Sequence, residues 1–238
     1  MDRVLWVTGA GSGMGRAAAV SAAANGWRVA LSGRRADALR ETQELITAAG
    51  GTAMVAPLDV RDGDQIAGAH ASITEQWGPV AGLVLSAGLN NPLRAWRDQR
   101  MSDFSDIVNT NLIAVAAVID EALPDLRQNA GTVVVISSFA GWRPSPNAGV
   151  AYSASKTALS ALCDSLNNQE AEHGVRACNL CPGDVDSEFL ALRPNVPDTD
   201  ARAVMLTPDD IGRAVQFVLD SPANVRINEL VITPTAQH

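Results

Sequence analysis

Short apolar runs alternate with longer stretches of helical spacing along almost the whole chain. The strand-like runs, rich in Val, Ile and Leu, lie at residues 3–8, 27–32, 52–57, 82–87, 132–137, 175–181 and 227–233. Ala-rich stretches with helical periodicity fill most of the intervals, at residues 16–26, 36–50, 64–78 and 104–126. Near-continuous apolar strands separated by helices are typical of a parallel sheet covered on both faces. The pattern therefore predicts a doubly wound α/β fold with about seven strands.

The chain has no internal feature that marks a domain boundary. Its 238 residues fit one large domain, and neither a low-complexity linker nor a repeat of fixed period divides them. We expect a single domain over residues 1–238. The least regular stretch is 183–207, which precedes a helix that Pro208 is suited to open. A long irregular segment in a compact domain is usually a lid or binding loop, so 183–207 is expected to cover a substrate.

The charge balance argues against nucleic acid as a partner. The chain carries 26 acidic against 18 basic residues, a formal charge of -8, and has no Lys/Arg run longer than Arg34–Arg35. The N-terminal sequence "MDRVLWVTGAG" lacks the basic and apolar regions of a signal peptide. No apolar stretch approaches the length of about 20 residues that crosses a bilayer. These observations predict a cytoplasmic protein without a membrane partner.

The three cysteines are assigned no chemistry. Cys178 and Cys181 form a C-x-x-C, which is found in redox and zinc sites, but no second ligand pair accompanies them and only three His are scattered along the chain. A buried strand that ends in a loop is the favoured interpretation, and no metal is expected. Cys163 leaves an odd number, which is unlike a secreted disulfide framework.

A glycine-rich segment follows the first strand-like run. "TGAGSGMG", Thr8 to Gly15, stands directly before an Ala-rich helix. Glycines at such a turn let backbone N–H groups approach an anion, and the helix N-terminus favours negative charge. The spacing is T-G-x-x-x-G-x-G rather than G-x-G-x-x-G. A tight structural turn explains one or two of these glycines, whereas four of the seven residues from Gly9 to Gly15 indicate a dinucleotide site.

The end of the second strand indicates which dinucleotide. An acid there would accept hydrogen bonds from the adenosine ribose, but Gly33 occupies the position and Arg34 and Arg35 follow it. Two guanidinium groups suit a 2′-phosphate, so NADP(H) is favoured over NAD(H). Two alternatives stay open: the arginines are a solvated helix start, or the cofactor is NAD(H), because "GSG" in the glycine segment lacks a basic residue.

The only tyrosine and the only lysine of the chain stand four residues apart. Tyr152 and Lys156, in "AYSASK", are separated by about one helical turn, so on a helix both project from one face. A phenol near its free pKa of about 10 exchanges protons poorly at neutral pH, and a neighbouring ammonium favours the phenolate. The pair therefore indicates acid–base chemistry at Tyr152, with its pKa lowered by Lys156.

Six short motifs in order resemble those of the short-chain dehydrogenase/reductase family over nearly the whole chain. They are the glycine segment, "LDV" at residues 58–60, "NTNL" at 109–112, "ISSFAG" at 136–141, the Tyr-x-x-x-Lys pair and "CPGDV" at 181–185. The resemblance implies a Rossmann-like fold with a nicotinamide cofactor. The implied cofactor contacts are Thr8, Gly9, Gly11, Ser12, Gly13, Met14, Gly15, Arg34, Arg35, Asp59, Val60, Ala87, Gly88, Tyr152, Lys156, Pro182, Gly183, Val185 and Ser187.

The same resemblance implies a catalytic set of Asn111, Ser138, Tyr152 and Lys156. Tyr152 is then the acid in reduction and the base in oxidation, Ser138 hydrogen-bonds the substrate oxygen, and Asn111 anchors a water that relays protons to Lys156. The implied function is an alcohol dehydrogenase or carbonyl reductase that transfers a hydride between NADP(H) and a carbonyl or secondary alcohol. The alternatives are the same reaction with NAD(H) and a dinucleotide-binding regulator without turnover.

The substrate is a small molecule, and its pocket is expected in the loops that follow the strands. The expected lining residues are Asn90, Trp96, Trp142, Arg143, Phe189, Leu190 and Arg193. Arg143 or Arg193 is a candidate partner for a substrate carboxylate, although a surface arginine beside a loop is common. The resemblance also implies a homodimer or homotetramer, assembled through the helices around 103–125 and 152–172.

Overall fold

A computed structural model describes residues 3–143 and 145–237. The strands are β1 (Val4–Thr8), β2 (Arg28–Ser32), β3 (Thr52–Val55), β4 (Val80–Leu85), β5 (Thr132–Ile136), β6 (Arg176–Pro182) and β7 (Glu229–Ile232). The longer helices are α1 (Gly13–Ala24), α2 (Ala36–Ala48), α3 (Gly63–Trp77), α4 (Met101–Val108), α5 (Ala114–Asn129), α7 (Val150–Gln169) and α9 (Pro208–Leu219). Shorter helical elements are η1 (Asn109–Ile113), α6 (Phe139–Trp142), η2 (Ala171–His173), η3 (Glu188–Leu192) and α8 (Thr199–Ala203).

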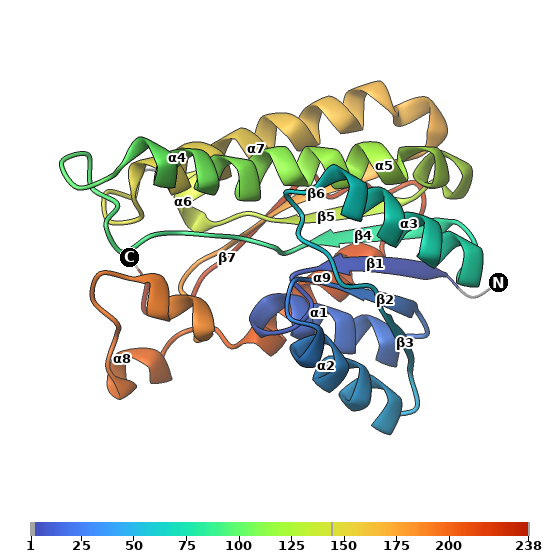
Figure 1. Ribbon diagram of the computed structural model, residues 1–238, viewed down its shortest axis with the longest axis horizontal. Coiled ribbons are helices and arrows are strands. Elements are labelled where there is room, and N and C mark those ends of the chain that lie inside the picture. Colours follow the sequence, from blue (N-terminus) through green and yellow to red (C-terminus); the bar gives the residue numbers. More distant parts are fainter. Residues whose placement is uncertain (1–2, 144, 238) are drawn as a thin grey trace.

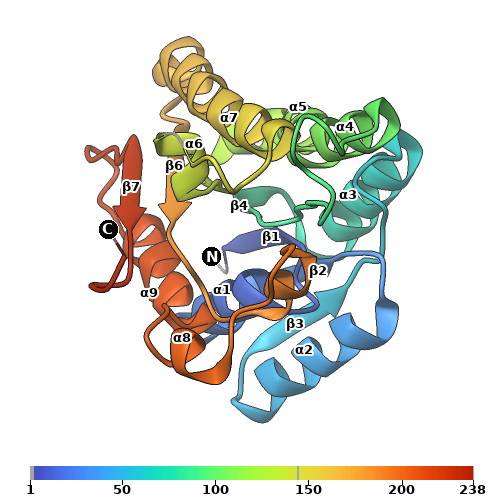
Figure 2. The same ribbon diagram turned by 90° about the vertical axis from the view of Figure 1, so that its left-hand side faces the viewer.

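The strands form one parallel sheet in the order β3-β2-β1-β4-β5-β6-β7. The order reverses between β1 and β4, so this doubly wound sheet has its switch point where those two strands end. In Figure 1 the strands run from the N-terminus at the right toward the left, and Figure 2 views the sheet from that left side. The predicted seven-stranded Rossmann-like fold is confirmed. Ligands of such sheets bind outside the carboxyl ends of the strands at the switch point.

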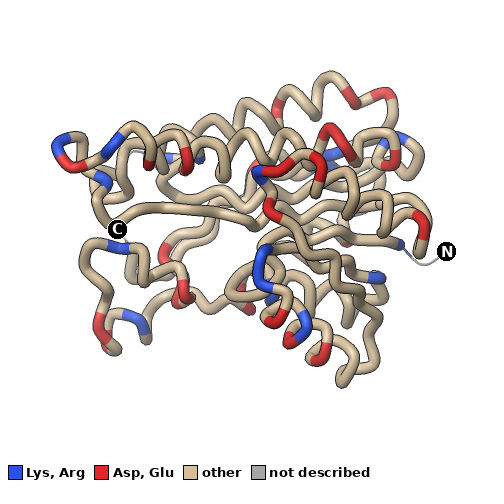
Figure 3. Tube along the Cα trace, in the orientation of Figure 1, with Lys and Arg blue, Asp and Glu red and all other residues tan. Residues whose placement is uncertain are grey.

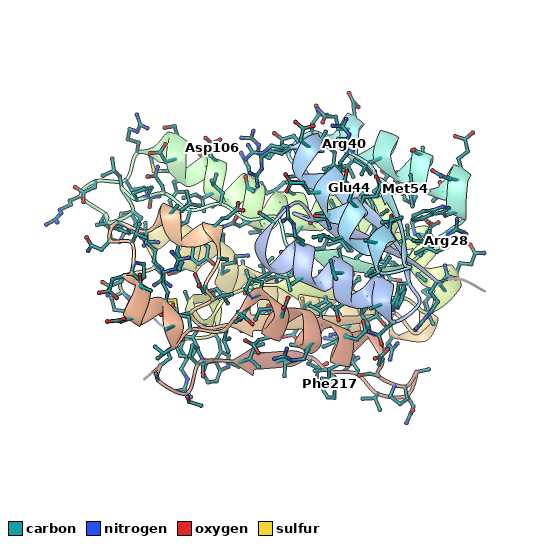
Figure 4. The ribbon with its side chains drawn as sticks, turned by 90° about the horizontal axis from the view of Figure 1, so that it is seen from below. Arg28, Arg40, Glu44, Met54, Asp106 and Phe217 are labelled. Carbon is teal, nitrogen blue, oxygen red and sulfur yellow. The ribbon has the colours of Figure 1, made fainter. Side chains whose placement is uncertain are left out.

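Helices cover both faces of the sheet. α3, α5 and α7 lie on one face, and α1, α2 and α9 lie on the other (Figure 1). Each layer has its own apolar cluster: Ile73, Val118 and Leu159 belong to the first, and Leu39 and Val215 belong to the second. Figure 4 looks onto the second layer from below. Because both faces are covered, the strands need apolar side chains in both directions, which explains their continuous apolar runs.

Residues 101–129 form one continuous helix in which η1 is a π-helical turn between α4 and α5. By length and composition this helix is apolar enough to cross a membrane, so the expectation that no stretch approaches that length is wrong. Its apolar residues Val115, Val118, Ile119 and Leu126 are buried against the sheet. The apolar character therefore reflects core packing in this layer.

The segment 183–207 is less irregular than the sequence suggests, since it contains η3 and α8. It ends at the helix that Pro208 was expected to open. Thr207 caps α9: the Asp210 N–H donates to Thr207 Oγ1, and the Thr207 N–H donates to the Asp210 carboxylate at 2.7 Å. This reciprocal capping sets the helix start and confirms that prediction.

Charged residues are interspersed over the fold. Lys and Arg are interspersed with Asp and Glu along the chain in Figure 3, and several form short-range pairs, such as Arg100 with Asp103 and Arg61 with Asp59. Exposed pairs of this kind contribute little to stability, so the fold depends mainly on the two apolar layers.

Candidate active site

The glycine segment forms the turn between β1 and α1. Gly9 and Gly13 have positive φ values of 67° and 51°, a conformation that favours glycine. A Cβ on Gly15 would lie 2.7 Å from the carbonyl carbon of Gly9, so only glycine lets the helix start so close to the strand. The turn therefore leaves its backbone accessible at the N-terminus of α1, as a phosphate-binding turn requires.

A cavity of about 370 Å³ opens beside this turn, at the carboxyl ends of the strands. Thirteen of the expected cofactor residues line it: Gly9, Ser12, Gly13, Met14, Arg34, Arg35, Asp59, Val60, Ala87, Gly88, Tyr152, Lys156 and Ser187. The glycine turn, the ends of β2 and β3 and the Tyr-Lys helix thus meet at one cavity. Segments more than 100 residues apart in the sequence come together here.

Six expected cofactor residues do not line the cavity: Thr8, Gly11, Gly15, Pro182, Gly183 and Val185. Their contacts support its walls. Thr8 Oγ1 accepts hydrogen bonds from the backbone N–H groups of Ser86 and Ala87, which joins β1 to the loop after β4. The Gly183 N–H donates to Ile232 O at 2.7 Å, which joins the end of β6 to β7.

Three guanidinium groups lie where the adenosine end of a dinucleotide would bind. Arg34, Arg35 and Arg61 all line the cavity. Arg61 forms a two-pronged pair with Asp59, which lowers the pKa of that carboxyl below its ordinary value. Arg35 donates to Ser12 Oγ at 3.4 Å and pairs with Glu188 at 3.3 Å. Three guanidinium groups against the two carboxylates that pair with them, Asp59 and Glu188, leave a net positive charge at this end of the cavity.

Tyr152 and Lys156 project from one face of α7, as their spacing predicts, with Lys156 Nζ 5.9 Å from the Tyr152 ring centroid. The pKa of Tyr152 differs from the sequence expectation. Burial raises it, while a hydrogen bond with Ser138 and the charges of Arg193 and Arg94 lower it. Lys156 is not the group that opposes the rise in this structure.

The reason lies in how Lys156 is held. Its side chain is 4% exposed, and its ammonium donates to Ile136 O at 2.7 Å. Burial lowers the pKa of Lys156 to about 8. An ammonium with that pKa exchanges protons near neutral pH, which suits a proton relay.

Asn111 lies in the π-helical turn η1 and is fully buried. Its Oδ1 accepts from Leu89 N at 2.7 Å, and its Nδ2 donates to Leu89 O and to Ser155 Oγ. A Cβ on Gly88 would lie 3.7 Å from Asn111 Oδ1 and 3.9 Å from Lys156 Nζ, so both groups face the same glycine. The π-turn thus brings this amide next to Gly88, which lines the cavity, although Asn111 itself does not line it.

Ser138 and Ser137 take different roles at the end of β5. Ser138 caps α6, accepting from Ala140 N, and hydrogen-bonds with Tyr152. Ser137 donates to Lys156 O at 3.0 Å and supports the helix that carries the tyrosine. The structure thus brings Ser138, rather than its neighbour, to the phenol.

The expected substrate residues are only partly gathered. Phe189 lines the cavity and packs against Tyr152, with ring centroids 6.0 Å apart. The other six, which do not line it, are Asn90, Trp96, Trp142, Arg143, Leu190 and Arg193.

Each of these six has another environment. Asn90 is buried and donates to Ala148 O, and Leu190 is buried at 4% exposure. Trp96 is 79% exposed. Arg143 stacks over Trp142, and Arg193 pairs with Asp184. Spacing alone does not show which way a loop side chain points.

Sequence reasoning missed several cavity residues. They are Gly33, Leu58, Arg61, Ser86, Leu89, Thr110, Ile136, Ser137, Glu188 and Leu192. A usable signal existed for Arg61, which follows Asp59 by two residues after the third strand, and for Glu188, which is next to Ser187. Arg94 was also missed, and its charge acts on Tyr152.

Cys178 and Cys181 lie in strand β6, as expected, and both are buried. Burial raises the pKa of their thiols to about 12 and about 11, so neither is a thiolate at neutral pH. In the part of the chain that the structure describes, no three His, Cys, Asp or Glu side chains gather into a metal-binding group.

A family model described as short chain dehydrogenase matches residues 3–195. Over 244 residues the chain is 32% identical to sulfoacetaldehyde reductase of Chromohalobacter salexigens, covering 100% of this chain and 96% of that protein. It is 33% identical to glycine betaine reductase ATRR of Emericella nidulans, covering 98% of this chain but only 19% of that much longer protein.

The fold is also similar to that of a solved alcohol dehydrogenase from the archaeon Thermococcus sibiricus, complexed with 5-hydroxy-NADP. The two share 28% sequence identity with a TM-score of 0.90, and the match covers 100% of this chain and 99% of the other.

Proposed function

This chain belongs to the short-chain dehydrogenase/reductase family, and within that family of oxidoreductases we propose that it interconverts a carbonyl compound and the corresponding alcohol with NADP(H) as cofactor. The observation that carries the proposal is that Tyr152 and Lys156 line the cavity that the glycine turn opens, while Ser138, which is not itself a lining residue, hydrogen-bonds with Tyr152.

The residues present fit a dinucleotide. Gly9 and Gly15 form a cradle that any Cβ would fill, and the N-terminus of α1 faces the same cavity as three guanidinium groups. In the proposal the glycine turn holds the pyrophosphate, Arg34 and Arg35 hold the adenosine end, and Lys156 holds the nicotinamide ribose. A bound nicotinamide supplies a hydride to the substrate carbon, or accepts one from it.

Tyr152 is the proposed acid–base group. In reduction its phenolic oxygen gives a proton to the substrate oxygen, and in oxidation it removes that proton. Ser138, which hydrogen-bonds with Tyr152, orients the substrate oxygen. Lys156, with a pKa lowered to about 8, returns the proton to Tyr152. Asn111, which faces Lys156 across Gly88, anchors the water of this relay.

NADP(H) is proposed over NAD(H) because of the charge at the adenosine end. Gly33, Arg34, Arg35 and Arg61 line the cavity, and the acid that would accept the ribose hydroxyls is replaced by Gly33. A solved relative with 28% identity binds an NADP derivative, which supports the same choice. Two guanidinium groups suit a 2′-phosphate by charge-assisted hydrogen bonds.

The cofactor preference is testable by fluorescence titration with NADPH and NADH. Replacing Arg34 and Arg35 together by Ala is expected to weaken NADPH binding far more than NADH binding. Arg40→Ala is the matched control, because Arg40 lies on helix α2 (Figure 4), which begins directly after Arg35, and because it pairs with Asp37 and does not line the cavity. An equal loss for both cofactors would contradict the assignment.

Residues 183–207 are proposed to cover the substrate as part of this single domain. Ser187, Glu188, Phe189 and Leu192 from this segment line the cavity. Of the expected substrate residues, Phe189 is the one at the cavity wall beside Tyr152. A small polar substrate, as in the name of the relative sulfoacetaldehyde reductase, is part of the proposal. Assembly into a homodimer or homotetramer belongs to the same proposal and is measured by light scattering.

The central test is Tyr152→Phe. Turnover of a panel of ketones and aldehydes with NADPH is expected to fall by about 10²-fold to 10⁴-fold, because the acid is lost, while the NADPH dissociation constant stays within about threefold. Ser138→Ala should lower kcat, whereas Ser137→Ala should mainly lower the melting temperature through the lost bond to Lys156 O. Retained turnover in Tyr152→Phe would refute the mechanism. Dinucleotide binding without turnover of any substrate by the wild type would instead favour a regulator.

A further inference from the structure

Arg94 is held firmly against the start of the helix that carries Tyr152. It lies in the loop between β4 and α4, where its carbonyl oxygen accepts from Val150 N at 3.3 Å. Its aliphatic stem lies on Gly149, where a Cβ would come within 2.6 Å of Arg94 Cβ. Gly149 has a φ of 94°, so glycine is needed there for both reasons. The backbone and the stem of Arg94 are thus fixed beside the active site.

Its guanidinium group lacks a matching anion. Nη1 donates to Ala148 O at 3.3 Å, a long hydrogen bond, and Nε is buried without a hydrogen-bond partner. Among residues 3–143 and 145–237 no carboxylate forms an ion pair with Arg94. Burial lowers the pKa of Arg94, and the positive charge of Arg193 lowers it further. An unpaired, part-buried charge of this kind is costly.

Other arginines of this chain show how a structural role is satisfied. Arg127 makes a two-pronged ion pair with Glu170, at 2.7 Å for each bond. The two Nη atoms of Arg176 donate to four oxygen acceptors within 3.1 Å, although its Nε, like that of Arg94, is buried without a partner. Arg94 has neither arrangement. A purely structural explanation accounts for its stem but leaves its guanidinium uncompensated.

Arg94 packs on residues 148–150, at the start of the helix that carries Tyr152, although it does not itself line the cavity. It and Arg193 are the two cations whose charges lower the pKa of Tyr152. The guanidinium of Arg193 is already engaged by Asp184, and Arg143 lies over the ring of Trp142 at 4.1 Å on the surface. Of these three arginines, Arg94 is therefore the one whose guanidinium has neither an ion pair nor an aromatic partner among the described residues. Its charge nevertheless lowers the pKa of Tyr152.

We propose that Arg94 binds an anionic group of the substrate, a carboxylate or a sulfonate, while Tyr152 exchanges a proton with the substrate's oxygen. The proposal rests on the proposed function and narrows its substrate to oxo acids and the corresponding hydroxy acids. In reduction the carbonyl carbon gains a hydride from the reduced cofactor, the carbonyl oxygen gains a proton from Tyr152, and the acid group is unchanged. A bond from the Arg94 guanidinium to an acid oxygen supplies the anionic partner that the described residues do not provide.

The test compares kcat/KM for matched substrates with saturating NADPH. The panel contains oxo acids with one to three carbons between the two groups, the methyl ester of each, and the equivalent oxo sulfonates. The wild type is expected to prefer at least one acid over its ester by 10-fold or more. In Arg94→Gln that preference should fall by about 10-fold to 100-fold, as expected for the loss of a charge-assisted bond, whereas the accompanying rise in the pKa of Tyr152 should affect an acid and its ester alike.

Two further variants keep the result interpretable. Arg94→Lys retains the charge and is expected to keep part of the preference. Arg97→Gln removes an exposed arginine of the same loop, paired with Asp98, and should leave the preference unchanged. Melting temperatures of the variants with bound NADP+, with and without butanoate or butanamide, give a second readout. Butanoate should raise the melting temperature of the wild type more than butanamide does, and this difference should vanish in Arg94→Gln.

The outcomes separate this proposal from the general one. If the wild type reduces acids and esters equally, or if Arg94→Gln keeps the preference, the role of Arg94 is refuted while the oxidoreductase activity stands. If the wild type reduces none of the panel or of neutral ketones and aldehydes, the proposed function and this inference fail together. A preference for sulfonates over carboxylates would identify the anion and support the role of Arg94.

Discussion

The ammonium of Lys156 donates a hydrogen bond to the carbonyl oxygen of Ile136 across 2.7 Å, and among the described residues Ile136 is its only hydrogen-bond partner. Ile136 ends strand β5, so the bond joins helix α7 to the sheet beside the cavity. The ammonium is buried without a carboxylate, which is why its pKa is lowered to about 8. The protein thus keeps a costly charge at the place where the proposed chemistry needs one.

Lys156→Met is expected to stabilise the protein without cofactor while abolishing turnover. The folded-state pKa of about 8 lies below the reference value of 10.5, so the folded protein binds this proton less readily than the unfolded chain does. The penalty is fully present below pH 8 and disappears as the pH rises toward 10.5. Its upper limit is about 3 kcal/mol, and the lost hydrogen bond offsets about 1 kcal/mol.

Urea denaturation at pH 7 and pH 10 checks this prediction. The variant should be more stable than the wild type by about 1–2 kcal/mol at pH 7, and the difference should shrink at pH 10. A variant that is less stable at pH 7, or a difference that does not change with pH, would contradict it.

Arg193→Gln should move the pH dependence of alcohol oxidation. The positive charge of Arg193 lowers the pKa of Tyr152, so its removal raises that pKa and shifts the rising limb of kcat to higher pH. Asp184→Asn removes the ion-pair partner but keeps the charge, and it should leave the limb in place or move it to lower pH. Measurements of kcat from pH 6 to pH 10 test both variants. If the rising limb of the Arg193→Gln profile stays at the wild-type pH, the charge of Arg193 does not act on the phenol of Tyr152.

Glu188→Gln should strengthen NADPH binding. Glu188 pairs with Arg35 at 3.3 Å in an exposed position and places a negative charge beside the expected 2′-phosphate site. An exposed pair is worth at most about 1 kcal/mol, so the NADPH dissociation constant should fall about two- to fivefold, with little change for NADH. Glu41→Gln is the control, because Glu41 pairs with Arg16 outside the cavity lining. Weaker NADPH binding in Glu188→Gln would argue against the placement of the phosphate.

Gly15→Ala and Gly68→Ala should change stability in opposite directions. The new Cβ at position 15 would lie 2.7 Å from the carbonyl carbon of Gly9, and overpacking of this kind costs about 1–3 kcal/mol or more. Gly68 is exposed in helix α3 with no atom within 4 Å of the new Cβ, so alanine should add about 0.5–1 kcal/mol. Denaturation midpoints and NADPH titration measure both effects. If Gly15→Ala keeps the wild-type denaturation midpoint and NADPH affinity, the turn has room for a side chain.

Much of the fold and of the inner site was predictable from local patterns. The alternation of apolar runs and helical stretches predicted the seven parallel strands, because burial on both faces imposes that pattern on each strand. The spacing of Tyr152 and Lys156 predicted their common helix face, since one turn of helix aligns residues four apart. Both features depend on neighbours in the sequence.

The outer part of the site was less predictable. Trp96 and Trp142 were expected in the pocket but are exposed, whereas Arg61 and Glu188 line the cavity without having been expected. The direction of a loop side chain depends on distant partners, which a local pattern does not contain. The pKa of Tyr152 is a further example, because burial and two distant arginines act on it more than the adjacent lysine does.

By itself, therefore, the sequence determined the order of strands and helices, the glycine turn and the Tyr152–Lys156 pair, because each is a short-range pattern of side-chain size and spacing. Only the tertiary structure decided which charges meet at the cavity. The charge of Arg94 acts on Tyr152, 58 positions further along the sequence, because the loop after β4 packs on Gly149, directly before α7. Electrostatic interactions depend on distance in space and on burial, and both exist only in the folded chain.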